Sequence, residues 1–193
     1  MSLLALPSTR EEGWRWSSLA ELPALAEAAP KRARHHNLDE LWLGCGGPRL
    51  VFVDGRFDAD ASDPSPVALG PVEADAEGHP LARLAEGQAG WTLTLGRGQA
   101  PAHTIEIIHI ATGGACHLPA RIALGEDAQA SVVESFVGDG WANRLTMIEL
   151  GRSARLMRSL RLTQDTGFVS LREVARVGQG ASLVTVALVT GGA

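Results

Sequence analysis

Hydrophobic and polar residues alternate in short runs over the second half of the chain. The runs WTLTLG and HTIEIIHIA are followed by segments in which Val, Thr, Ser and Gly recur in near-alternating order. A helix would instead show apolar residues at positions i, i+3 and i+4, whereas alternation with β-branched residues is typical of strands. The pattern predicts short β-strands over residues 91–193.

A short motif recurs three times in this region. The segments IALGEDAQ, IELGRSAR and ARVGQGAS align their glycines at Gly125, Gly151 and Gly178, which are 26 and 27 residues apart. A fixed period of this size is typical of a solenoid. Each repeat is predicted to form one coil of a parallel β-helix, with neighbouring coils about 4.8 Å apart. Glycine would permit the tight bend, and a small alanine would fit inside the corner.

Like residues recur at matching positions of the three repeats. The aligned rows are Ile122/Ile148/Ala175, Leu124/Leu150/Val177, Ala128/Ala154/Ala181, Ala130/Leu156/Leu183 and Phe136/Leu162/Val189. Stacking such rows would bury a continuous apolar core, which one coil cannot do alone. A further row, Val132, Arg158 and Thr185, is not uniform, so we expect it at a corner or facing outward.

The first part of the chain has helical patterns. Thr9 and Glu12 have the spacing of a capping box, which predicts the start of a short helix carrying Trp14 and Trp16. Helical spacing continues at Leu19, Leu22, Leu25 and Ala26, and again at Leu38, Leu41 and Trp42. We expect a small helical unit that packs its tryptophans on the rest of the molecule.

A hairpin and a connector separate these two parts. In LVFVDGRFD, two β-prone runs flank Asp54 and Gly55, which is a strong hairpin signal. Residues 58–90 are mostly Ala, Asp, Glu, Pro and Gly, which predicts a surface excursion with a few short strands or helical turns. The predicted fold is mainly β, a right-handed parallel β-helix after a small helical segment. Its expected parts are residues 1–48 (helical segment), 49–90 (hairpin and connector) and 91–193 (β-helix coils).

Charge and length restrict the function classes. The 193 residues carry a formal net charge of −5, and Lys31 is the only lysine, so no overall positive field would attract nucleic acid or an anionic membrane. Seven arginines lie between Arg144 and Arg176 against three acids. We interpret this stretch as a solvated face.

Cysteine content and hydropathy indicate a reduced, cytoplasmic setting. Cys45 and Cys116 are too few for a disulfide framework and lack the CxxC spacing of a zinc or redox site. No stretch approaches the roughly 20 apolar residues that a membrane span needs. The first residues, MSLLALPSTREEG, lack the basic, apolar and small-residue order of a signal peptide.

Four residues are candidates for metal binding. His103, His109, Cys116 and His117 lie within fifteen residues, which fits either structural and surface histidines or a site for iron or another metal. The spacing in HTIEIIH differs from the His-x-His pair of a jelly-roll metal site. If residues 103–109 form one strand, both of its histidines share a face and would point outward.

No pattern of an active site emerges. A β-helix enzyme acting on carbohydrate would present clustered acids on an outer face and aromatic platforms for sugars. We place only Glu134 among the acids inside a predicted strand of the repeats, Tyr is absent, and aromatics are 5% of the chain. We expect no catalytic residue and no enzyme activity. A carbohydrate-active β-helix enzyme and a direct iron or cluster binder are the alternatives.

Three motifs in order resemble the SufB/SufD family of the SUF iron-sulfur cluster assembly system. They are TREEGWRWSSL at residues 9–19, LVFVDGRFD at residues 50–58 and LGEDAQASVVESFVG at residues 124–138. The long acidic connector and a single early His-Cys pair favour a SufD-type member. The resemblance implies a non-catalytic scaffold of a SufBCD complex, which pairs with SufB through its β-helix and binds the SufC ATPase through C-terminal helices.

The chain differs from this family in length. Family members are roughly twice as long, so we expect an N-terminal half that lacks the later coils, the SufC-binding helices and the cluster-associated Cys and His positions. We therefore transfer no ligand residue, and we expect the iron-sulfur cluster at the level of the assembled complex rather than in this chain alone. An uncovered last coil would offer unpaired backbone groups. We expect it to pair with a second copy and form a homodimer.

Overall fold

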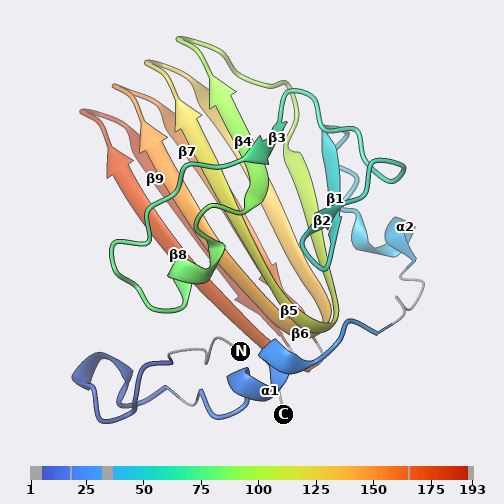
Figure 1. Cartoon of the computed structure of the whole chain (residues 1–193). Coiled ribbons are helices and arrows are strands. Elements are labelled where there is room, and N and C mark those ends of the chain that lie inside the picture. Colours follow the sequence, from blue (N-terminus) through green and yellow to red (C-terminus); the bar gives the residue numbers. More distant parts are fainter. Residues whose placement is uncertain (1–5, 18, 32–36, 165, 191–193) are drawn as a thin grey trace.

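A computed structural model describes residues 6–17, 19–31, 37–164 and 166–190 (Figure 1). Strands account for 49% of the chain and form a β-solenoid of about 4 turns. The predicted mainly-β solenoid is therefore confirmed. Two 3₁₀ helices, η1 and η2, and two short α-helices accompany nine strands within these ranges. In chain order the elements are η1 (Glu12–Trp14), α1 (Leu22–Glu27), α2 (Leu38–Leu41), β1 (Arg49–Val53), β2 (Arg56–Phe57), β3 (Ala68–Pro71), η2 (Ala82–Ala85), β4 (Ala89–Leu95), β5 (Ile105–Leu124), β6 (Gln129–Leu150), β7 (Arg155–Leu162), β8 (Phe168–Val177) and β9 (Ser182–Val189).

The solenoid has two walls of parallel strands. One wall stacks β1, the first part of β5, the first part of β6, β7 and β9. The other stacks β4, the second parts of β5 and β6, and β8. In Figure 1 the long strands β5 and β6 turn from one wall to the other at the lower end of the molecule. The first coil consists of β1 and β4, the second of β5, the third of β6, and the fourth of β7 and β8.

The predicted rows coincide with the strand register. Leu124 is paired with Leu150 and Leu150 with Val177, and the other aligned strand residues are paired in the same way. The repeated glycines also stack, since the backbone N–H of Gly151 donates to Leu124 O at 2.7 Å. A Cβ atom on Gly151 would lie only 2.9 Å from both Glu126 N and Gly125 C. Glycine is needed here because neighbouring backbones approach closely.

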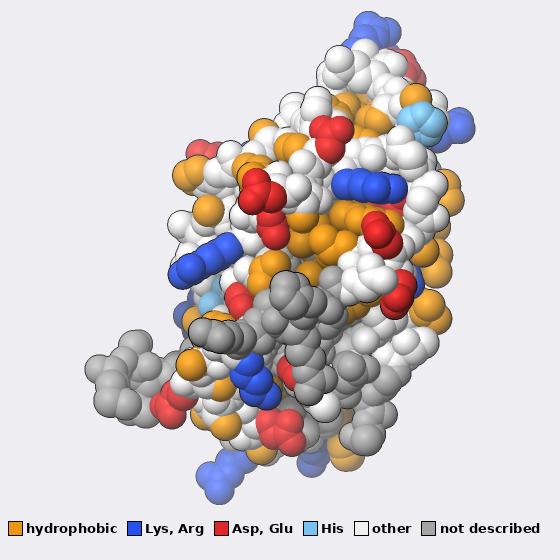
Figure 2. Space-filling model, turned by 90° about the vertical axis from the view of Figure 1, so that its right-hand side faces the viewer, with side chains coloured by type: hydrophobic (Ala, Val, Ile, Leu, Met, Phe, Trp, Pro, Cys, Tyr) orange, Lys and Arg blue, Asp and Glu red, His pale blue; other side chains and the backbone are white. Residues whose placement is uncertain are grey.

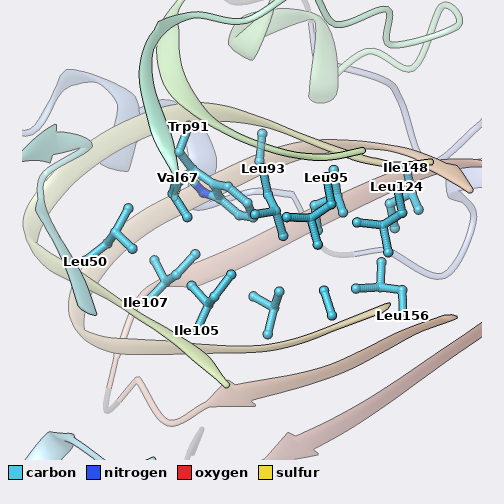
Figure 3. Packing of buried hydrophobic residues seen from close by; sticks show 14 of the residues in the cluster. Leu50, Val67, Trp91, Leu93, Leu95, Ile105, Ile107, Leu124, Ile148 and Leu156 are labelled. Atoms are coloured by element: carbon cyan, nitrogen blue, oxygen red, sulfur yellow. The ribbon is translucent and has the colours of Figure 1, made fainter. Parts of the chain in front are cut away.

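The apolar core lies between the two walls. Figure 3 shows Trp91, Leu93 and Leu95 of one wall facing Leu50, Ile105, Ile107 and Leu156 of the other. All of these side chains are buried. Full burial of such a side chain stabilises a fold by roughly 1.5–3 kcal/mol, so the stacked rows hold the coils together.

The hairpin prediction is confirmed. β1 and β2 pair antiparallel, with Phe52 opposite Phe57, and the turn residues Asp54 and Gly55 have φ values of 49° and 77°. Positive φ at both positions is the geometry that an Asp-Gly pair accommodates. β1 also pairs with β5 in parallel, so the hairpin strand is part of the first coil.

The connector packs more closely than a surface excursion. It contains the predicted short elements, β3 and η2, but Ala76, Ala82 and Ala85 are buried against Leu145 and Met147 on the outer face of β6. Those outward side chains are apolar, so they are covered rather than left in water. The connector is therefore a cover on the second wall.

The capping box expected at Thr9 and Glu12 is wrong by one residue. The backbone N–H of Ser8 donates to Glu11 Oε1 at 2.9 Å, and the Ser8 hydroxyl accepts from Arg10 N at 3.2 Å. Ser8 and Glu11 have the same i, i+3 spacing, so the reciprocal pair forms one position earlier.

The tryptophans of the helical segment have different environments. Trp14 packs near Leu22 and Trp141 and contacts His79 edge to face at 5.3 Å. Trp42, directly after α2, packs on the outer face of the first wall. Trp16 is 92% exposed, so the expectation that it packs on the rest of the molecule is wrong.

Among the described helices, the longest has six residues, and none has the length and apolar character that crossing a bilayer requires.

Candidate functional site

The four candidate metal ligands lie in different environments. His103 precedes β5 and is exposed, His109 is buried inside the solenoid, and Cys116 is buried on the opposite wall. His117 follows Cys116 in the strand and is half-buried beside the outward-facing Trp141. Over the described part of the chain, no three or more His, Cys, Asp or Glu side chains are grouped so that they could hold a metal ion.

The expectation that His103 and His109 point outward together is wrong for His109. β5 begins at Ile105, so His103 lies in a loop and outside the alternation. His109 shares the inward face with Ile105 and Ile107, because side chains two residues apart in a strand lie on one face.

His109 is part of an aromatic stack inside the solenoid. Its ring lies between Phe52 and Phe136, with ring centroids 5.5 and 4.6 Å apart. Burial, and then the charge of Arg144, lower the pKa of His109 to about 4. The ring is therefore neutral near pH 7, and its Nε2–H donates to Glu134 Oε2 at 3.0 Å.

Glu134 and Arg158 continue this contact into the next coil. Arg158 Nη2 donates to Glu134 Oε1 at 2.5 Å, and both side chains are 2% exposed. Arg158 Nη1 also donates to Glu173 on the opposite wall. Burial alone would raise the pKa of Glu134, but the charge of Arg158 and hydrogen bonds from His109 and Arg158 lower it to about 2. We call His109, Glu134, Arg158 and Glu173 the ion chain.

The ion chain overturns the expectation for the row Val132, Arg158 and Thr185. Val132 and Arg158 are buried and point inward, because they alternate in phase with the apolar inward residues of β6 and β7. The row is not uniform because Arg158 pairs diagonally with Glu134 and across the interior with Glu173. Neither position is a corner.

The interpretation of the arginine-rich stretch as a solvated face is wrong for two of its residues. Arg158 is buried, and so is Arg144, whose Nη1 lies 3.1 Å from Asn143 O and 3.9 Å from Cys116 Sγ. Arg144 also lies over the Phe136 ring at 5.3 Å. Three other arginines pair with acids at the surface: Arg152 with Glu126, Arg172 with Glu77 and Arg176 with Glu149.

His117 belongs to a polar cluster beneath the connector. Its Nδ1 accepts from Asn143 Nδ2 at 3.0 Å, and the same amide donates to the Leu81 carbonyl at 2.8 Å. Ser170 Oγ accepts from Trp141 Nε1 at 2.8 Å and donates to Asn143 Oδ1 at 2.7 Å. Burial, and then the charge of Arg144, lower the pKa of His117 to about 4. These contacts hold the connector on the second wall.

Cys45 lies in a clamped turn. The Glu106 carboxylate accepts from the backbone N–H groups of Leu43 and Cys45, both at 2.7 Å. Burial, and then the Glu106 charge, raise the pKa of the Cys45 thiol. Since the thiolate is the reactive form, this environment disfavours nucleophilic chemistry.

The last coils present an exposed apolar surface. Over the described residues, β9 pairs only with β7 and β8 only with β6, so each has one free edge. We call β9 together with β8 the open end. Its exposed apolar residues are Val177, Val184, Val186, Leu188 and Val189. Leu188 is 52% and Val189 67% exposed, and apolar residues alternate on both faces of β9. Such a surface is typical of a protein-interaction site.

Charges elsewhere on the visible surface are mixed. Figure 2 views the side on which β1, β2 and α2 lie in Figure 1 and shows acidic and basic side chains interspersed among apolar ones. A mixed face of this kind does not create a one-signed field.

The sequence alone indicated the rows and missed the ion chain. Glu134 and Arg158 each interrupt an otherwise apolar inward alternation, in VVESF and LMRSL, and that interruption was the available signal. Glu149 and Glu173 also lie in strands, so Glu134 is not the only acid in the strands of the repeats. Because Glu134 and Arg158 are enclosed by protein, the ion chain does not present a catalytic pair to a substrate.

Comparison with known proteins agrees with the resemblance found in the sequence. No family model matches the chain. The chain is 30% identical over 165 residues to the iron-sulfur cluster assembly protein SufD of Escherichia coli (strain K12). The match covers 73% of this chain but only 38% of the SufD chain. The chain therefore spans well under half the length of the curated relative it matches, and this similarity supports the SufB/SufD resemblance.

Proposed function

We propose that this chain is a non-catalytic scaffold component of iron-sulfur cluster assembly, of the SufD type within the SufB/SufD family. The similarity to SufD supports the pathway. The observation that carries the scaffold role is the open end, where apolar side chains and free strand edges are exposed together. The buried charges pair with one another, which leaves contact with other proteins as the role that the surface favours.

The proposed partner at the open end is another β-helix. Free edges of β8 and β9 would be paired by one more coil, and the exposed valines and leucine would be covered by its apolar rows. In a SUF complex that β-helix belongs to a SufB homologue. In the isolated chain a second copy takes its place, which gives a homodimer with the two solenoids stacked end to end.

A binding experiment with surface variants tests this proposal. Val186→Asp and Leu188→Asp each place a carboxylate on the apolar face of β9, so binding to a purified SufB homologue should weaken at least tenfold, or by about 1.4 kcal/mol. Trp16→Asp is the matched control, because Trp16 is exposed and lies outside the open end. Equal binding by all three variants would place the interface elsewhere.

Sedimentation of the chain alone tests the second-copy arrangement. We expect a concentration-dependent dimer that Leu188→Asp dissociates and Trp16→Asp leaves intact. A parent chain that stays monomeric at high concentration would refute the homodimer. A SufC homologue should not be retained, since the SufC-binding helices implied by the resemblance are not recognised in this sequence.

We infer that the chain alone binds no cluster, and that the cluster belongs to the assembled complex. The alternative is direct iron or cluster binding through Cys116, His117, His109 and His103. Anaerobic reconstitution with iron and sulfide separates the two, because a bound cluster absorbs visible light. An absorbance band that is lost in Cys116→Ser would support the alternative, whereas no band in the parent chain would support the scaffold.

A further inference from the structure

The ion chain places charges in rows that are otherwise apolar or uncharged. Glu134 is stacked between Ile107 and Leu160, while Arg158 continues the row of Val132. Glu173 is paired with Thr146 on the second wall. Stacking of like residues therefore does not account for these three positions.

The apolar rows leave the register of the fourth coil underdetermined. If β7 slid by two residues along β6, Leu156 would face Val132 instead of Ala130, and Leu160 would face Phe136 instead of Glu134. Apolar side chains would still face apolar side chains, because a shift of two residues keeps every side chain on its own face. Repetition of the coils makes such slips a hazard.

The ion chain distinguishes the observed register from the slipped ones. β7 and β8 belong to one coil and run in opposite directions across the interior, so a slide of that coil along its path carries Arg158 and Glu173 apart. A slide in the other direction also moves Arg158 away from Glu134. Each loss leaves a buried charge without a partner, which is strongly unfavourable.

We propose that the ion chain is a register lock: it permits one stacking of the fourth coil on the third, the stacking in which Glu134, Arg158 and Glu173 are all paired. Buried ion pairs contribute little net stability compared with apolar residues of similar volume, because desolvation offsets their attraction. Their role here is the selection of one arrangement among several that the apolar rows would accept.

Disulfide trapping between outward positions of β6 and β7 tests the lock. Ser131 is opposite Met157 in the observed register, and cysteines at these two positions would cross-link. Cysteines at Ser131 and Ser159, or at Ser131 and Arg155, would be about 8 Å apart, which exceeds the reach of a disulfide. All pairs are made in a chain whose own cysteines are replaced, by Cys45→Ser and Cys116→Ala.

Each cysteine pair is introduced into three chains. One is the otherwise unchanged parent. The second is a charge-free chain carrying His109→Phe, Glu134→Leu, Arg158→Met and Glu173→Gln. The third is a matched control with four apolar substitutions, Ile105→Leu, Ile107→Leu, Leu160→Met and Leu162→Met.

The parent and the matched control should cross-link only the 131–157 pair. The charge-free chain should fold and should cross-link a shifted pair as well. A charge-free chain that forms only the 131–157 disulfide would overturn the proposal, since the register would then be fixed without the charges. A charge-free chain that fails to fold, while the matched control folds, would also overturn it, because the charges would then supply stability and not selection.

Discussion

At the scale of single residues, the interior of this solenoid combines like-residue stacking with one set of complementary charges. His109 takes an aromatic position between Phe52 and Phe136, which a neutral imidazole can do because it is planar and apolar on its faces. Arg158 is held by two carboxylates, so its charge is compensated within the protein. The one-residue signal for each was a polar residue in an apolar alternation.

Removal of one charge from this set should be more costly than removal of all of them. Arg158→Met leaves Glu134 and Glu173 without their cation, and breaking a buried pair in this way costs about 3–5 kcal/mol. Urea unfolding followed by tryptophan fluorescence measures the loss. Arg155→Met on the same strand is the control, because Arg155 is exposed and its replacement should stay within about 0.5 kcal/mol. Equal losses for both variants would contradict the paired role of Arg158.

At the scale of elements, turns and corners depend on glycines of two kinds. Gly125, Gly151 and Gly178 stack where backbones approach closely. Gly140 and Gly167, at the opposite corner, have φ values of 103° and 101°, which favour glycine for its conformational freedom. These two are 27 residues apart, so the same period that revealed the first set could have revealed the second.

Gly151→Ala tests the close approach. The added Cβ would lie 2.9 Å from two backbone atoms, which cannot move aside as a side-chain tip can. We expect a loss of about 1–3 kcal/mol in the free energy of unfolding. Gly13→Ala is the control, since nothing lies within 4 Å of its added Cβ. A Gly151→Ala protein as stable as the Gly13→Ala protein would show that the corner can open.

At the scale of the whole molecule, the solenoid is a stack of coils with a connector over one wall and α2 with Trp42 over the other. The connector is held by the cluster of His117, Asn143 and Leu81 and by apolar contacts of its alanines. Neither covering follows from the repeat, because the repeat describes only contacts between successive coils. The open end is the part of this assembly that the proposed function uses.

Acid should destabilise the whole fold in two steps. The folded-state pKa values of His109 and His117 are about 4, below the model value of 6.5, so the unfolded chain takes up protons first and stability falls as the pH drops from 6.5 towards 4. Glu134, with a pKa of about 2 against 4.5, adds a loss between 4.5 and 2. The contribution of these groups is fully present above pH 6.5.

Urea midpoints measured between about pH 7.5 and pH 4 check this order. His109→Phe should flatten part of the upper step, because phenylalanine keeps the aromatic row and removes the titrating group. His103→Gln, at an exposed position, should leave the pH profile unchanged. A parent midpoint that is constant from pH 7 to pH 4.5 would contradict the neutral, buried state of His109.

The sequence by itself determined the strands, the hairpin, the period of the coils and the residues that stack in rows. It could do so because these features depend on local alternation and on contacts repeated at a fixed spacing, so each coil carries the information for its neighbours. Only the tertiary structure decided that Arg158 and Glu134 point inward, that Glu173 meets them from the other wall, and that the connector covers Leu145 and Met147. Those contacts join residues across the interior or between the repeats and a non-repeating segment, and no periodicity along the chain records which of them meet.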